Sequence, residues 1–282
     1  MRRLTPLRYP GGKAQLADFF VTFVELNELG DGVYVEPFAG GAGVAIALLL
    51  NEYVGEVMIN DIDPAVYAFW VSATEHTEDF CRRIASVPLT ICEWERQRDM
   101  HRAADATDVL QLGFSMFYLN RTNRSGILNG GVIGGKAQTG GWKIDARFNR
   151  DELIDRVRRI GRYRSRITVS NKDAAVFLTN LQSSLPAKSL AYLDPPYYEK
   201  GQHLYTNYYR DHDHKQIAKL VAQLKQPWIV SYDNCPEIRA MYKGFRRTEY
   251  ELGYSARDRR RGAEVMFFSD HVRVPAKLSP YA

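Results

Sequence analysis

The chain has 282 residues, 45% hydrophobic and 25% charged, a composition typical of a globular protein with room for two domains. Its 38 Lys and Arg residues outnumber the 33 Asp and Glu residues, and the formal charge of +5 favours a polyanionic partner. The three cysteines include no CxxC pair and no apolar run reaches membrane-spanning length, so we expect a cytoplasmic protein without disulfides, structural zinc or membrane segments.

Short apolar runs that end in acidic or polar residues recur along the chain and indicate strands. They do not alternate with polar residues, which is typical of strands buried on both faces of a sheet. We predict strands at residues 33–36, 57–61, 190–194 and 228–233. A helical pattern follows Asp211 or Asp213, either of which would serve as its N-cap. Strands alternating with helices predict an α/β fold with a mostly parallel sheet and helices on both faces.

The stretch between the second and third predicted strands departs from this alternation. It contains polar helical segments, a glycine-rich passage and a basic run at residues 156–166. We therefore predict that residues 1–74 and 170–282 form one domain, and that residues 75–169 form a smaller inserted domain. The basic run and another at residues 257–261 are candidates for phosphate contacts, although such runs often only face solvent.

The first predicted strand ends at Glu36 and leads into a glycine-rich turn at residues 38–43, followed by an apolar helical run. Glycines let the backbone approach a ligand at the carboxyl end of a strand, where open α/β sheets bind their ligands. Helix packing against the sheet is the alternative reason for such small residues.

Two carboxylates, Asp61 and Asp63, close the second predicted strand. In nucleotide-binding sheets, an acidic residue about 20 residues beyond the glycine turn accepts hydrogen bonds from ribose hydroxyls. Asp61 is the better candidate for this role and Asp63 the next. Either could instead cap the helix that Pro64 begins.

The strongest single motif is Asp194-Pro195-Pro196-Tyr197, at the end of the third predicted strand. An exocyclic base amine is a poor nucleophile because its lone pair is delocalised into the ring, so a catalyst must accept its protons and orient it. The Asp194 carboxylate and the Pro195 carbonyl can both accept, and neither proline has an N–H to compete. Tyr197 offers a face on which a base can stack. A tight turn after a strand is the alternative.

Together with the segment Arg8-Tyr9-Pro10-Gly11-Gly12-Lys13, these motifs closely resemble the Dam-like, D12 class of DNA adenine methyltransferases. The chain has that family's motif order over almost its whole length. The resemblance implies a Rossmann-like methyltransferase sheet in which the strands ending at Glu36 and Asp194 are neighbours. It also implies S-adenosylmethionine as the cofactor, double-stranded DNA as the partner, and no metal. Ala42 departs from the family's turn, which leaves the turn geometry open.

The resemblance assigns roles residue by residue. The catalytic group is Asp194, Pro195, Pro196 and Tyr197, in the domain made of residues 1–74 and 170–282. The cofactor-binding residues would be Tyr9, Gly12, Lys13, Glu36, Phe38, Gly40, Asp61 and Asp173.

The inserted domain resembles the family's target-recognition domain. Its segment at residues 118–129 is similar to the family's Leu-Asn-Arg element, which leads into a DNA-reading hairpin, and its residue types suit base edges and phosphates. The expected DNA contacts are Asn120, Arg121, Arg124, Ser125, Asn129 and, in the basic run, Arg158. Arg124 and Ser125 replace the aromatic residue and asparagine usual in GATC-specific members, so we do not assign that site. A plain polar loop is the alternative.

The sequence therefore predicts a site-specific enzyme that transfers a methyl group to N6 of an adenine flipped out of a duplex. Methylation of cytosine N4 or of an RNA base is the rival within enzymes, and a DNA-binding module that has lost catalysis is the rival outside them. The segment Asp211-His212-Asp213-His214 looks like a metal cluster, but acidic residues at a predicted helix start are better explained as caps. The recognition site, the oligomeric state and a companion restriction enzyme stay open.

Overall fold

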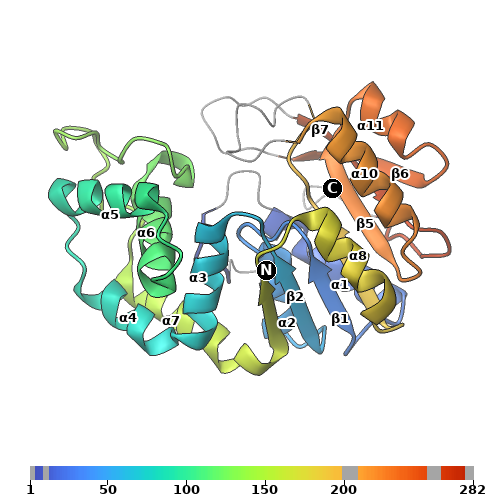
Figure 1. The fold of residues 1–282 in the computed structure, drawn as a ribbon, viewed down its shortest axis with the longest axis horizontal. Helices are drawn as coiled ribbons and strands as arrows, with labels where there is room; N and C mark the ends of the chain where they lie inside the picture. Colours follow the sequence, from blue (N-terminus) through green and yellow to red (C-terminus); the bar gives the residue numbers. More distant parts are fainter. Residues whose placement is uncertain (1–3, 9–12, 199–208, 253–261, 277–282) are drawn as a thin grey trace.

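The computed structural model describes residues 4–8, 13–198, 209–252 and 262–276, and within them seven strands form one mixed sheet (Figure 1). The strand order is β3-β2-β1-β4-β5-β7-β6. Neighbours from β3 to β5 are parallel, whereas β7 is antiparallel to both β5 and β6. The strands are β1 (Val33–Glu36), β2 (Glu56–Asn60), β3 (Ile167–Ser170), β4 (Ser189–Leu193), β5 (Trp228–Asp233), β6 (Arg246–Leu252) and β7 (Gly262–Phe268).

The predicted strands are confirmed. Those predicted at residues 33–36 and 228–233 match β1 and β5, while β2 and β4 each begin and end one residue earlier than predicted. Their apolar sequences follow from burial, because helices cover both faces and Val35, Ala191 and Val230 have no exposed surface. β6 was not predicted, and its charged sequence fits its place at the edge of the sheet.

Helices cover the sheet in two layers. One face packs on a core that includes Phe20 and Phe69, and the other face packs on a core that includes Leu178 and Val221. The first layer consists of α1 (Ala17–Leu26), α2 (Gly43–Leu50) and α3 (Pro64–Glu75), with the short helix η1 (Lys13–Leu16) before them. The second layer consists of α8 (Ala174–Ser184), α10 (Asp211–Ala222) and α11 (Pro236–Met241).

A helical lobe stands beside this sheet, between α3 and β3 (Figure 1). It consists of α4 (Thr77–Ser86), α5 (Ile91–Ala103), α6 (Val109–Thr122), η2 (Arg124–Gly126) and α7 (Arg150–Arg162), with η3 (Arg164–Arg166) leading into β3. Its aromatic residues Phe80 and Phe117 pack on Phe69 of α3, so lobe and sheet share one continuous core. The domain boundary expected after residue 169 falls inside β3.

The helix predicted after residue 211 is α10, but its N-cap is Arg210 rather than an aspartate. The backbone N–H of Arg210 donates to the carboxylate of Asp213 (2.8 Å), which places Asp213 in the first turn of the helix. Among the described residues, no helix combines the length and apolarity needed to cross a membrane.

Candidate active site

The site lies between β1 and β4, where the order in which the chain adds strands to the sheet reverses. β1 and β4 are neighbours, and the chain leaves β1 toward β2 on one side and β4 toward β5 on the other. Open α/β sheets bind ligands in the crevice at the carboxyl ends of such strands. Glu36 ends β1 and Asp194 follows β4, so both acidic groups face this position.

Asp194 is held through one of its two carboxylate oxygens. Its Oδ1 accepts a hydrogen bond from Ser231 Oγ (2.6 Å) and lies 3.0 Å from Lys13 Nζ. Ser231 Oγ is in turn 2.8 Å from the hydroxyl of Tyr192. Within the part of the chain that the structure describes, the Oδ2 atom of Asp194 has no hydrogen-bond partner. Burial raises the pKa of Asp194, and the Lys13 ammonium opposes this rise.

The rest of the Asp-Pro-Pro-Tyr motif is packed into the protein. Pro195 is buried and Pro196 half-buried. Tyr197 is buried as well, and its hydroxyl donates to Glu264 Oε1 (2.6 Å) on β7. The Lys13 ammonium lies 5.3 Å from the centre of the Tyr197 ring. The ring expected to stack on a base is therefore covered in this structure.

Lys13 reaches the carboxylates at the end of the sheet. Its ammonium lies between Asp194 and Glu264, at 3.0 Å and 3.3 Å, and it donates to the Tyr197 hydroxyl (3.3 Å). Lys13, which was expected beside the cofactor, thus contacts Asp194, the carboxylate expected to be catalytic. Tyr9 and Gly12, expected at the same location, lie outside the described residues.

The glycine-rich turn is closed by Asp61. Asp61 Oδ2 accepts the N–H of Gly40 (2.8 Å), and its Oδ1 accepts the N–H of Asp63 (3.0 Å). Gly40 has φ 44° and Ala42 has φ 41°, so the alanine adopts the left-handed conformation that glycine adopts more easily. Burial raises the pKa of Asp61 to about 6. Asp63 caps α3 by accepting the N–H of Ala65 (2.8 Å), which was the alternative interpretation for this residue.

Glu36 is buried beside the same turn. Its Oε1 accepts from the hydroxyl of Tyr34 (3.1 Å) and from the N–H of Ala45 (3.1 Å) in α2. Burial raises the pKa of Glu36 to about 8. Burial thus favours the protonated form of this carboxyl at neutral pH.

Aromatic and apolar groups accompany the acidic residues at this edge. The ring of Phe38 lies edge-on to that of Tyr209 (5.7 Å), and Asp173 caps α8 by accepting the N–H of Ala175 (2.9 Å). Ile62 and Val176, beside Asp61 and Asp173 in sequence, are 42% and 53% exposed. Exposed apolar side chains next to acidic loop residues suit the flat face and the ribose of a nucleoside.

Sequence reasoning missed two polar residues of the site, Ser231 and Glu264. Ser231 stands in an otherwise apolar strand, and this isolated polar position was the available signal. Glu264 had no comparable signal, because β7 itself was not predicted. Both are buried; Ser231 donates a hydrogen bond to Asp194, and Glu264 forms an ion pair with Lys13.

Comparison with known families agrees with this geometry. The family model described as D12 class N6 adenine-specific DNA methyltransferase matches residues 9–255. The chain belongs to this D12 family. It is therefore an adenine-specific DNA methyltransferase.

Comparison with other proteins adds little to the D12 assignment. No curated protein matches. A putative RNA methyltransferase from Pyrococcus horikoshii is 12% identical, with a TM-score of 0.44, covering 93% of this chain and 85% of that one. An rRNA methyltransferase from Streptomyces viridochromogenes is 11% identical, with a TM-score of 0.41, covering 92% of this chain and 85% of that one.

In this D12 methyltransferase, the segment expected to recognise DNA contains both buried and exposed residues. Asn120 is buried, and its amide accepts from the N–H of Arg8 (2.8 Å) and donates to the carbonyls of Arg8 (2.9 Å) and Gly126 (3.0 Å). The Asn120 side chain, which was expected to contact DNA, thus makes three hydrogen bonds within the protein. Arg124, Ser125 and Asn129 are exposed, as a DNA contact requires.

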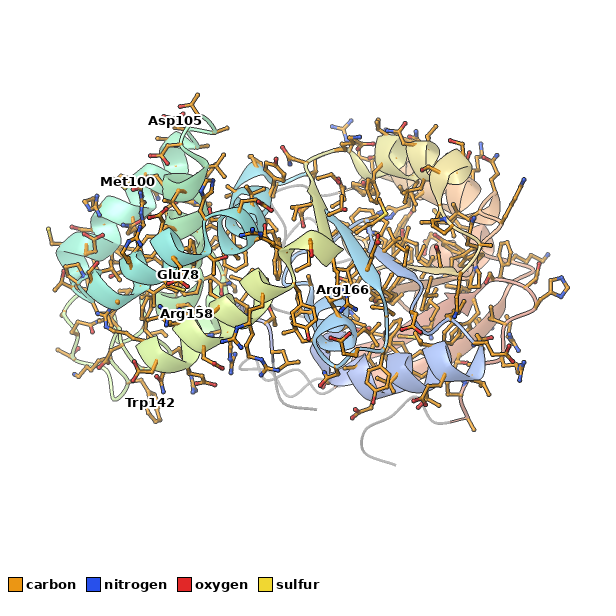
Figure 2. All side chains as sticks on the ribbon, turned by 90° about the horizontal axis from the view of Figure 1, so that it is seen from below. Glu78, Met100, Asp105, Trp142, Arg158 and Arg166 are labelled. Atoms are coloured by element: carbon orange, nitrogen blue, oxygen red, sulfur yellow. The ribbon has the colours of Figure 1, made fainter. Side chains whose placement is uncertain are left out.

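The two remaining expected DNA contacts are engaged within the protein. Arg121 donates to the carbonyls of Arg147 and Pro6, and burial lowers its pKa to about 9. Arg158 pairs with Glu78 through two hydrogen bonds (3.0 and 2.9 Å), and Figure 2 shows the two residues side by side. α7 ends near the start of β3, so Arg158 lies toward the amino ends of the parallel strands, whereas Asp194 lies at their carboxyl ends.

Proposed function

We propose that this enzyme transfers the methyl group of S-adenosylmethionine to N6 of an adenine that is flipped out of duplex DNA. The observation that carries the proposal is the asymmetric environment of Asp194. Lys13 and Ser231 hold its Oδ1, whereas none of the described residues donates a hydrogen bond to its Oδ2, which can accept one from a substrate. A target amine has N–H groups to offer at this position.

The residues around the glycine turn fit the proposed cofactor. The Asp61 carboxylate would accept from ribose hydroxyls, and the exposed Ile62 and Val176 would lie against the adenine. Glu36 would face the charged methionine end, because its raised pKa lets it release a proton when a cation arrives. When bound, the cofactor supplies an electrophilic methyl group to the site.

Asp194 acts on the amine in two ways. Together with the Pro195 carbonyl, it accepts the two N–H groups and so directs the nitrogen lone pair toward the methyl carbon. Orientation of this kind can contribute about 7 to 11 kcal/mol to the rate. As the new N–C bond forms, the bond between the methyl carbon and the donor sulfur breaks, and S-adenosylhomocysteine would leave. The nitrogen becomes cationic, and the negative charge of Asp194 stabilises it. The proton then passes from nitrogen to Asp194 and on to water.

For DNA recognition, we assign base contacts to Arg124, Ser125 and Asn129. They lie in the loop between α6 and α7, which Figure 1 shows at the same end of the molecule as the carboxyl ends of the strands. Their donors and acceptors suit base edges in the major groove. Asp194 and this loop would then bind the same duplex.

Mass spectrometry of digested DNA tests the proposed reaction directly. Duplex DNA is incubated with the protein and with S-adenosylmethionine labelled at the methyl group. N6-methyladenine carrying the label is the expected product, and single-stranded DNA and RNA serve as comparison substrates. Labelled N4-methylcytosine, or label only in RNA, would refute the proposal.

A further inference from the structure

The buried carboxylate of Glu264 has no assigned part in the reaction. Glu264 lies on β7 and is 1% exposed. It accepts hydrogen bonds from Tyr197 (2.6 Å) and Tyr250 (2.7 Å), and its Oε2 is 3.3 Å from Lys13 Nζ. Burying a carboxylate is costly, and an apolar residue would fill a strand position of this kind more cheaply. A buried carboxylate at this position is therefore better explained by a role in the reaction than by stability.

The position of Lys13 explains what such a charge achieves. Its ammonium lies between the carboxylates of Asp194 and Glu264. The ammonium favours the ionised form of Asp194, which is the form that accepts the amine protons. A lone ammonium at this distance would also repel the positive charge that develops on the amine during transfer. A second carboxylate cancels that repulsion without removing Lys13.

We propose that Glu264 is a positioning residue for methyl transfer. Its charge balances that of Lys13, and its hydrogen bond holds the Tyr197 side chain in place. The inference rests on the proposed function, because it assumes that Asp194 accepts the amine. Glu264 acts through Lys13 and Tyr197, and it requires no contact of its own with the substrate.

The pH dependence of the rate distinguishes this role from a purely structural one. Activity should fall at low pH as Asp194 takes up a proton. The Lys13 charge lowers the pKa of Asp194, whereas the Glu264 charge raises it. Among the described residues, the other titratable groups that interact with Asp194 are Tyr34 and Glu36 from β1, Tyr192 from β4 and Tyr250 from β6.

Glu264→Gln keeps the shape of the side chain and removes its charge. We expect kcat to fall about 10- to 100-fold, because the Tyr197 side chain and the Lys13 ammonium are no longer held in place. The KM for DNA and the Kd for S-adenosylmethionine should change less than about threefold. The acid limb of the kcat profile should move to lower pH. Lys13→Met should move the same limb to higher pH.

Two further variants serve as controls. Tyr250→Phe removes one hydrogen bond from Glu264 but not its charge, so the acid limb should stay in place. Glu249→Gln makes the same chemical change on the neighbouring strand β6, where the side chain is exposed, and should leave the rate and the profile unchanged.

The results separate this inference from the proposed function. A wild-type protein that forms no N6-methyladenine would refute the proposed function itself. An active wild type, with Glu264→Gln at the wild-type kcat or with an unshifted acid limb, would overturn only the role of Glu264. If Glu264→Gln does not fold, Lys13→Met decides the question, since an unmoved acid limb in that variant also overturns the inference.

Discussion

Asp194 offers a direct test of the chemistry at the scale of one residue. Asp194→Asn keeps the size of the side chain but replaces the anionic acceptor with a neutral amide. We expect kcat to fall by at least about 100-fold, similar to the loss of one stabilising group in an oxyanion hole. Burst or single-turnover methylation measures this rate. The Kd for S-adenosylmethionine, measured by calorimetry, should stay within a few-fold of wild type, and an unchanged kcat would remove Asp194 from the mechanism.

Asp61 gives a prediction about cofactor affinity and its pH dependence. Its pKa is raised to about 6, so the carboxylate that would accept from the ribose is lost as the pH falls through 6. We expect the Kd for S-adenosylmethionine to rise over that range. Asp61→Asn should weaken binding by roughly 1.5 to 3 kcal/mol at pH 7.5.

The neighbouring carboxylate provides the control for Asp61. Asp63→Asn alters a helix cap two residues away and should change the Kd little. Calorimetry at several pH values measures all three proteins. Equal affinities for wild type and Asp61→Asn would move the ribose contact to another residue.

The same Asp61 shift has the opposite sign for stability. The folded protein binds a proton more tightly at Asp61 than the unfolded chain does, because burial raises its pKa above the usual value near 4. Its contribution to the free energy of unfolding is therefore present at low pH and is lost as the pH rises toward 6. Cofactor binding and folding thus favour opposite protonation states of this residue.

At the scale of elements, the contact of α6 with α3 depends on Gly113. A Cβ atom at this position would lie 2.5 Å from the carbonyl oxygen of Ala68 and 2.8 Å from the backbone nitrogen of Phe69. Alanine improves helix propensity by about 1 kcal/mol. Because the contacts are with backbone, the helices must move apart, and overpacking costs about 1 to 3 kcal/mol or more.

We therefore expect Gly113→Ala to lower the free energy of unfolding by about 2 kcal/mol, which is the upper end of the overpacking cost less the gain in helix propensity, because the close contacts are with rigid backbone atoms. Urea denaturation measures the change. Gly141→Ala is the matched control, since a Cβ there meets no atom within 4 Å. A Gly113→Ala protein as stable as wild type would mean that the lobe is free to shift against α3.

At the scale of the whole molecule, the proposed function requires that the helical lobe and the site at the carboxyl ends of the strands bind one duplex. Figure 2 shows Trp142 projecting from the lobe, and this residue is 71% exposed. Arg124 is exposed in the same inter-helical segment, whereas Arg158 is paired with Glu78 nearer the opposite edge of the sheet. The two arginines should therefore behave differently toward DNA.

We expect Arg124→Ala to reduce discrimination at one base pair by about 1 to 3 kcal/mol. Arg158→Ala should leave both the base preference and the salt dependence of binding at wild-type values, because Arg158 lies away from the proposed DNA path. Methylation rates on duplexes varied one base pair at a time test the first expectation, and salt titrations test the second. A reduced salt slope for Arg158→Ala would place the DNA backbone near α7 after all.

The sequence by itself determined β1, β2, β4 and β5, the mostly parallel sheet and the motif that follows β4, because local hydrophobic pattern and local turn chemistry carry this information. It did not predict β3, β6 or β7. Glu36 and Asp61, which the sequence assigns to the cofactor, lie beside the glycine-rich turn, and their part in cofactor binding stays a prediction. The tertiary structure alone decided where long polar side chains point. It turned Asn120 inward, paired Arg158 with Glu78, and brought Lys13 between Asp194 and Glu264, residues far apart in the chain. Such placements depend on packing between distant elements, which no local pattern encodes.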